Sequence, residues 1–133
     1  LRAFLVSSYG ECLKGEDTFA ITSFYMEGTQ PDIQQPLSGP YLTYNQPSNH
    51  YAYKEKEPVL LDFYVSNCFL SRDGYRVRLT LDAVVLCDLY EWLPYYILGL
   101  NKGKHTIQLE LLDRKDQVVP GAFNVVEKSF LVY

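Results

Sequence analysis

Histidine is the side chain best suited to proton transfer near neutral pH, and this chain has two histidines. His50 lies in a stretch rich in Pro and Asn, and His105 begins a run that alternates polar and apolar residues. Nucleophilic catalysis needs a Ser, Cys or Thr that is activated by a base. The sequence has no Gly-x-Ser-x-Gly elbow and no Cys beside a His. We therefore predict that neither histidine is catalytic and that the protein is not an enzyme.

Paired carboxylates could also carry out acid–base catalysis. Glu11, Glu16 and Asp17 cluster near the start of the chain in what we interpret as a polar loop, and residues 54–57 alternate Lys and Glu as a solvated charge run does. Glycine-rich phosphate loops and calcium-binding loops do not occur in the sequence. An enzyme that uses these carboxylates or His50 is therefore our least favoured hypothesis, and we expect no cofactor.

The three cysteines, Cys12, Cys68 and Cys87, are widely spaced. The chain has no Cys-x-x-Cys pair and no Cys/His cluster, so we predict no structural zinc site and no other metal site. An odd number of cysteines allows at most one disulfide and leaves one thiol over. We expect small, mostly buried thiols, and the redox compartment stays open.

Aromatic residues are frequent, at 15% of the chain, and twelve of them are Tyr. Tyr and Trp dominate binding hot spots because they give a large contact area at low entropic cost. The same rings could instead fill the core or fasten a long loop, or they could stack on sugar rings beside Asn45, Asn49 and Glu91. The candidate partner-binding residues are Tyr41, Tyr44, Tyr51, Tyr53, Trp92, Tyr95 and Tyr96.

The elements that must position these residues fit within one domain. A chain of 133 residues is too short for two full domains, so we treat residues 1–133 as a single unit with its own core. The net charge of −4, without a basic stripe, argues against nucleic acid as a partner. No apolar run approaches the length of about 20 residues that crosses a bilayer, so we expect no transmembrane segment.

Alternation with a period of two, the pattern of a strand with one buried face, is clearest in two segments. Residues 75–82 place Tyr, Val, Leu and Leu on one face, and residues 105–111 place Ile, Leu and Leu inward. Residues 59–65 are more continuously apolar, as expected of a central strand that is covered on both faces. Further strand candidates are 3–6, 18–26, 41–44, 84–87, 95–98, 118–119 and 125–132.

Turn-forming residues at 71–74, 100–104 and 113–116 separate these runs. Short strands at this spacing, without helical periodicity, predict an all-β fold, an immunoglobulin-like antiparallel β-sandwich. Residues 27–57 differ, because proline recurs there among Gln, Asn and Ser, and the segment is too long for a hairpin loop. We predict that 27–57 is an irregular Tyr/Pro-rich loop excursion, which its tyrosines fasten to one end or edge of the sandwich.

Several short motifs occur in a characteristic order along nearly the whole chain. They include Thr22-x-Phe24-Tyr25, Leu42-Thr43-Tyr44-Asn45-x-Pro47, Leu61-Asp62-Phe63-Tyr64-x-x-Asn67, Trp92-x-Pro94-Tyr95 and Gly103-x-His105-Thr106-Ile107. This series resembles a family of small uncharacterised immunoglobulin-like proteins from cyanobacteria and Bacteroidetes, some of them predicted lipoproteins. The resemblance implies a domain without enzymatic activity that is extracytoplasmic, in the periplasm, in a thylakoid lumen or at the cell surface.

Our leading hypothesis is a non-catalytic interaction or accessory module. It would dock through its Tyr/Pro-rich excursion onto a protein partner in a larger assembly, for which a membrane-bound complex is one option. The alternative is a carbohydrate-binding module in which Trp92, Tyr95 and Tyr96, or the tyrosines of the excursion, form a surface platform for a sugar.

Overall fold

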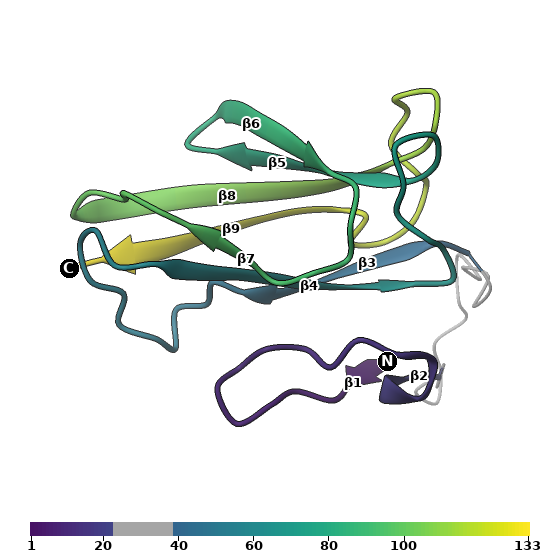
Figure 1. Ribbon diagram of the computed structural model, residues 1–133, viewed down its shortest axis with the longest axis horizontal. Helices are drawn as coiled ribbons and strands as arrows, with labels where there is room; N and C mark the ends of the chain where they lie inside the picture. The colour runs from purple at the N-terminus through teal and green to yellow at the C-terminus, as the bar shows by residue number, and fades with distance from the viewer. Residues whose placement is uncertain (23–38) are drawn as a thin grey trace, which may run out of the picture.

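The computed structural model describes residues 1–22 and 39–133, and within them two antiparallel sheets face each other as a sandwich (Figure 1). The first sheet has the order β3-β4-β7 and consists of β3 (Tyr41–Gln46), β4 (Val59–Ser66) and β7 (Tyr95–Ile97). The second has the order β6-β5-β8-β9 and consists of β5 (Arg76–Leu81), β6 (Val84–Leu89), β8 (Gly103–Leu112) and β9 (Val125–Val132). The predicted all-β antiparallel sandwich is confirmed.

An N-terminal arm, residues 1–22, lies outside the sandwich against the first sheet (Figure 1). It contains β1 (Arg2–Phe4), the 3-10 turn η1 (Glu16–Thr18) and β2 (Phe19–Ile21), and β1 pairs antiparallel with β2. The predicted strand at 18–26 is therefore present as β2 over 19–21, and its part beyond residue 22 lies outside the described residues.

The core lies between the two sheets and is built by the predicted alternation. Every second residue of β4, β5 and β8 points inward, because successive side chains of a strand point to opposite faces. The inward residues that are completely buried are Val59, Leu61, Phe63, Val77, Ile107, Leu109 and Leu111. The three alternating segments 59–65, 75–81 and 105–111 thus supply the inner faces, as the sequence predicts.

Strand β4 is covered on both faces, which confirms the expectation for its apolar sequence. Its outward residues Asp62, Tyr64 and Ser66 are 0%, 2% and 4% exposed, nearly as buried as its inward ones. The cover on the outer side is the N-terminal arm. A strand that is polar or amphipathic on its outer face can be buried there only if the cover supplies hydrogen-bond partners.

A tight turn joins β5 to β6. Asp82 and Ala83 have φ values of 48° and 65°, the left-handed conformation that two-residue hairpins need at both central positions. The Asp82 carboxylate accepts a hydrogen bond from the Thr106 backbone N–H at 2.8 Å and bonds His105 Nδ1 at 2.7 Å. The turn is thereby tied to β8, and β6 is held as the outermost strand of its sheet.

The irregular excursion predicted over 27–57 is interrupted at residues 41–46, which form β3 and confirm the strand candidate at 41–44. Leu42 is fully buried in the core, and the strand pairs with β4 from Tyr41↔Ser66 to Tyr44↔Phe63. The prolines lie outside this six-residue run, so they do not interrupt its pairing. Residues 27–38 lie outside the described residues, and residues 47–57 contain no strand, although Tyr53 makes an isolated bridge to β9.

We predict that Leu109→Ala lowers the free energy of unfolding by about 2–4 kcal/mol, since it leaves a cavity at a fully buried position. Leu131→Ala, on β9 but 41% exposed, should cost less than about 1 kcal/mol. Urea unfolding followed by Trp92 fluorescence measures both. Equal costs for the two variants would contradict the placement of the core.

Candidate interaction site

The predicted partner-binding tyrosines around β3 are mostly turned into the molecule. Tyr41 is 5% exposed and lies under the Arg2 guanidinium, which is 4.1 Å from its ring centre. Tyr44 and Tyr53 are half-buried, and their hydroxyl groups bond to residues 46–48. These three rings fasten the chain around β3 to the sandwich. Tyr51, which is 50% exposed, is the accessible member of this group.

The structure does not bring Trp92, Tyr95 and Tyr96 together as one flat platform. Trp92 is half-buried and its Nε1 donates a hydrogen bond to the Phe63 carbonyl oxygen at 3.0 Å. Tyr95 points inward and stacks on the Phe63 ring with an interplanar angle of 8°. Tyr96, the next residue of β7, points outward and is 61% exposed, because neighbouring strand residues face opposite ways.

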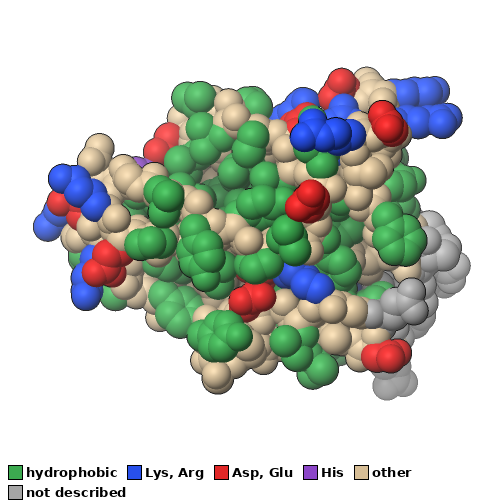
Figure 2. Space-filling model, viewed as in Figure 1, with side chains coloured by type: hydrophobic (Ala, Val, Ile, Leu, Met, Phe, Trp, Pro, Cys, Tyr) green, Lys and Arg blue, Asp and Glu red, His purple; other side chains and the backbone are tan. Residues whose placement is uncertain are grey.

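Exposed apolar side chains gather on the outer face of β7. Leu60 of β4 pairs with Tyr96, so the two side chains are neighbours on that face. Leu98 follows two residues later and is 71% exposed, and Leu93 precedes the strand and is 49% exposed. Hydrophobic side chains spread over the side of the molecule on which β7 lies (Figure 2). We call Leu60, Tyr96 and Leu98 the β7 patch.

Strand β6 carries a second group of exposed apolar residues. Val84, Val85 and Leu86 are 61%, 59% and 49% exposed, and the Cys87 side chain is exposed as well. The strand is hydrogen-bonded only to β5 within its sheet. We call residues 84–87 the β6 strip.

An open pocket of about 420 Å³ lies between the connection from β4 to β5 and the connection from β6 to β7. Tyr90, Tyr95 and Glu91 line it together with Arg72 and Asp88. The Arg72 guanidinium covers the Tyr90 ring at 4.9 Å, and Asp88 is held in ion pairs by two arginines of β5. Because these groups already have partners within the chain, the pocket offers a ligand less free surface than the β7 patch does.

The most specific polar arrangement joins the arm to β4. The fully buried Asp62 carboxylate accepts hydrogen bonds from the Cys12 backbone N–H at 2.6 Å and from Asn45 Nδ2 at 2.8 Å, and it forms an ion pair with the Lys14 ammonium group. A buried carboxylate is tolerated only with such partners. We call these four residues the Asp62 clamp.

The titration of the Asp62 clamp indicates a structural role. Burial alone would raise the pKa of the Asp62 carboxyl, but hydrogen bonds from Cys12, Lys14 and Asn45 outweigh burial and hold that pKa below its ordinary value. Burial, and then the contact with Asp62, raise the pKa of the Cys12 thiol. Cys12 therefore stays protonated at neutral pH and is a poor nucleophile.

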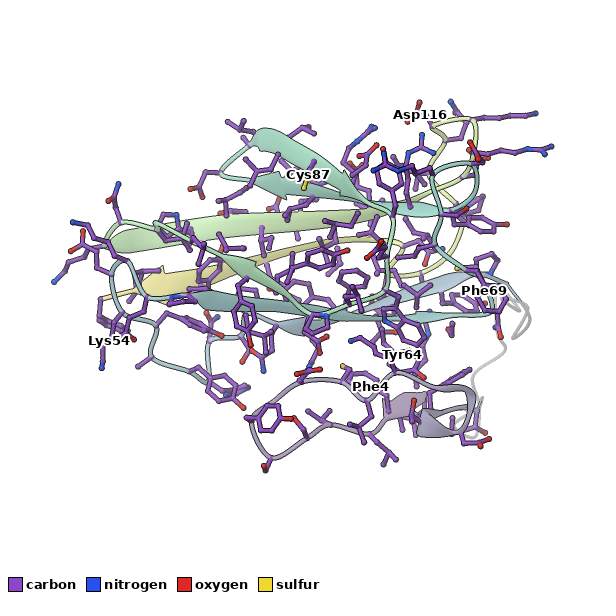
Figure 3. All side chains as sticks on the ribbon, viewed as in Figure 1. Phe4, Lys54, Tyr64, Phe69, Cys87 and Asp116 are labelled. Carbon is purple, nitrogen blue, oxygen red and sulfur yellow. The ribbon has the colours of Figure 1, made fainter. Side chains whose placement is uncertain are left out.

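Aromatic contacts complete the attachment of the arm. The Phe4 ring stacks on Tyr64 at 5.6 Å between ring centres (Figure 3), and Phe19 packs on Tyr64 at 5.3 Å. Trp92 meets the same ring edge-on at 4.7 Å, and the Tyr64 hydroxyl donates a hydrogen bond to the Gly15 carbonyl oxygen at 2.7 Å. The outer face of β4 is thus filled at Asp62 and Tyr64, and a partner would find the accessible apolar groups elsewhere.

The histidines and cysteines make local contacts within the described residues. Within residues 1–22 and 39–133, no group of three or more His, Cys, Asp or Glu could hold a metal ion. His105 donates from Nε2 to the Asn101 carbonyl oxygen at 2.8 Å and from Nδ1 to the Asp82 carboxylate at 2.7 Å. These bonds, that to Asn101 first, raise the pKa of His105. All three cysteines are free, and burial raises the pKa of Cys68 to about 12. No helix in the described part of the chain is long and apolar enough to cross a membrane.

Comparison with solved structures identifies the class of fold. The chain is similar to the fibronectin(III)-like modules of Clostridium thermocellum CbhA, with a TM-score of 0.50 and 16% sequence identity, over 70% of this chain and 94% of that chain. At this identity the similarity shows the fold alone, a fibronectin(III)-like sandwich of the immunoglobulin-like type. No protein-family model and no curated protein matches the sequence.

Sequence reasoning missed both the Asp62 clamp and the β6 strip. The sequence does hold a signal for each of them. Asp62 is the one charged residue in the apolar run 59–65, and residues 84–87 are four consecutive uncharged residues. An isolated acid in a buried strand indicates a polar partner, but the sequence does not say that the partner lies some fifty positions earlier.

We predict that Asp62→Asn lowers the free energy of unfolding by about 2 kcal/mol, because it removes the charge that pairs with Lys14 and weakens three hydrogen bonds. The exposed pair Lys54–Glu57, at 3.6 Å, supplies the control, since Glu57→Gln should change stability by less than about 0.5 kcal/mol. Urea unfolding at pH 7 measures both variants. A cost for Asp62→Asn no larger than that of the control would contradict the clamp.

We also predict that the difference in stability between the native protein and Asp62→Asn depends on pH. Because folding lowers the pKa of Asp62 from its ordinary value of 3.8, the stabilisation is fully present above that value and is lost as the pH falls through the lower pKa of the folded state. The other carboxyl groups titrate in both proteins and cancel in the difference. Urea midpoints from pH 7 to about pH 2 should therefore converge in acid, and a constant difference would contradict this prediction.

Proposed function

We propose that the protein is a non-catalytic interaction module that docks onto a protein partner through the β7 patch. The observation that carries the proposal is the exposure of Tyr96 and Leu98, side by side with Leu60, on the outer face of a short edge strand. Exposed apolar patches rimmed by polar residues mark partner surfaces. Tyr96 combines a large apolar ring with a hydroxyl group, which is the composition of a binding hot spot.

We further propose that the protein is a peripheral accessory subunit of a larger complex, which can include membrane-bound subunits. The fibronectin(III)-like fold supports this proposal. The present chain has that fold as a sandwich with an added arm, and CbhA contains it as modules. An extracytoplasmic location, in the periplasm or a thylakoid lumen, is part of the proposal and rests on the family resemblance of the sequence motifs.

Docking on a protein has more support than binding of a sugar. A sugar platform needs rings that share one accessible plane, whereas Tyr95 and Tyr96 face opposite sides of β7 and Trp92 is packed against Tyr64. The pocket beside Tyr90 keeps carbohydrate binding as the alternative, because it places an aromatic ring near Glu91 and Arg72.

We predict that a photoreactive amino acid at position 96 crosslinks one protein reproducibly in native extract of the source, and that Leu98→Glu in the same chain abolishes the crosslink. A charge in the centre of a desolvated apolar contact is costly. Phe69→Glu is the matched control, since Phe69 is 87% exposed but lies in a different connection. Crosslinking that survives Leu98→Glu, or that Phe69→Glu reduces equally, would overturn the proposed docking face.

A further inference from the structure

The β6 strip is an apolar strand edge that the described part of the chain leaves open. Strand β6 pairs with β5 on one side only, and its other side presents backbone N–H and C=O groups. Natural proteins usually protect such edges with Lys, Pro or a covering segment, because an open edge pairs readily with another strand. Residues 84–87 contain neither Lys nor Pro, and three of these four side chains are large and apolar.

The other strand edges of the sandwich are protected. On β9 the C-terminal end is covered, where Tyr133 donates a backbone hydrogen bond to Tyr53 and accepts one from Glu55, and the middle of the strand carries the exposed charged residues Glu127 and Lys128. The edge of β3 is covered by Arg2, which donates to the Leu42 carbonyl oxygen. Strand β7 is only three residues long. Among the described strands of the sandwich that are longer than three residues, the β6 strip is therefore the stretch of edge that is both uncharged and uncovered.

The charge around the β6 strip indicates what can occupy it. The two acidic residues that flank it are held by partners within the chain, because Asp82 is hydrogen-bonded by His105 and by the Thr106 backbone N–H, and Asp88 forms ion pairs with Arg76 and Arg78. A net charge of −4 would ordinarily disfavour contact between two copies, but no unpaired charge of the strip would face its counterpart. An uncharged apolar strand edge is complementary to itself.

We propose that the β6 strip is a homodimer interface, at which β6 of a second copy packs antiparallel about a two-fold axis. An isologous contact of this kind uses the same patch on both copies and closes the assembly at two. The register that pairs only uncharged residues places Val84 opposite Cys87 of the second copy and Val85 opposite Leu86. The two four-stranded sheets then continue across the axis as one sheet.

The shape of β6 limits the strength of this dimer. The register with β5 shifts between Leu79 and Thr80, so Leu86 is an extra residue that bends the strand. The contact therefore consists of a few side chains and a short stretch of backbone rather than a full six-residue ladder. An interface this small is weak and reversible, with a dissociation constant above about 1 µM.

Sedimentation velocity of the whole chain tests the proposal. The weight-average sedimentation coefficient should rise from the monomer value toward the dimer value between about 5 and 500 µM. Val85→Lys should keep the chain monomeric over this range, because a lysine on the edge brings two like charges together. Val118→Lys, a matched change at a valine that is 42% exposed outside the β6 strip, should associate like the native protein.

A spin label on Cys87 tests the geometry in the native chain and does not depend on the folding of any variant. Cys87 is the exposed cysteine, whereas Cys12 is 1% exposed and Cys68 is half-buried. In the proposed register the two Cys87 Cα atoms lie about 11 Å apart, three residues along the strand and one strand spacing across. Dipolar broadening that grows with concentration supports the proposal.

The homodimer is overturned if the native protein stays monomeric at about 500 µM, or if the spin label shows no broadening as the concentration rises. It is also overturned if Val118→Lys dissociates the dimer as fully as Val85→Lys does. These outcomes leave the β7 patch untouched, because crosslinking at position 96 is measured at low concentration and can be repeated in Val85→Lys. Loss of the position-96 crosslink with an intact dimer would overturn the docking function instead.

Discussion

A buried carboxylate in the middle of a sheet is the constraint on which the arrangement of this molecule depends. Asp62 lies on the outer face of β4. Its carboxylate would be stable there in contact with water, but burying it beneath another segment costs free energy. Its cover must therefore bring an ammonium group, an amide and a backbone N–H to one point, and the arm together with β3 does so. The arm cannot slide or reverse without leaving that charge unpaired, so one carboxyl group fixes the place of residues that are far away in the sequence.

The fold was predictable because the sequence patterns that specify its strands and turns each lie within a few neighbouring residues. The alternation of polar and apolar residues in 75–81 and 105–111 indicates which side chains face the core, and turn-forming residues indicate where each strand ends. The density of prolines around 41–46 made the excursion predicted over 27–57 too wide, although the strand candidate at 41–44 within it is present as β3. The arm could not be predicted, since its attachment depends on contacts such as Lys14–Asp62 and Phe4–Tyr64 that no local pattern encodes.

The candidate site was predictable in part, because Tyr96 is one of the seven candidate residues whereas the leucines beside it are not among them. An excess of tyrosine indicated an adhesive surface, yet most of these rings stabilise the chain itself, because a half-buried tyrosine satisfies its hydroxyl group at the rim while its ring fills the core. Tyr44 and Tyr53 behave in this way, and only orientation within a strand distinguishes Tyr95 from Tyr96. The accessible apolar surface consists more of Leu and Val than of Tyr, and it lies where two edges of the sandwich meet solvent.

The arm has a consequence for the order in which the molecule opens. Its anchoring points on β4 and the β6–β7 connection exist only once the sandwich has assembled, whereas the sandwich core contains no residue of the arm. The arm should therefore form a separate cooperative unit, which associates last and exchanges its amide hydrogens through a smaller opening than the strands beneath it. Tyr64 and Asp62, which are buried while the arm is in place, would then become exposed to solvent long before the core residues do.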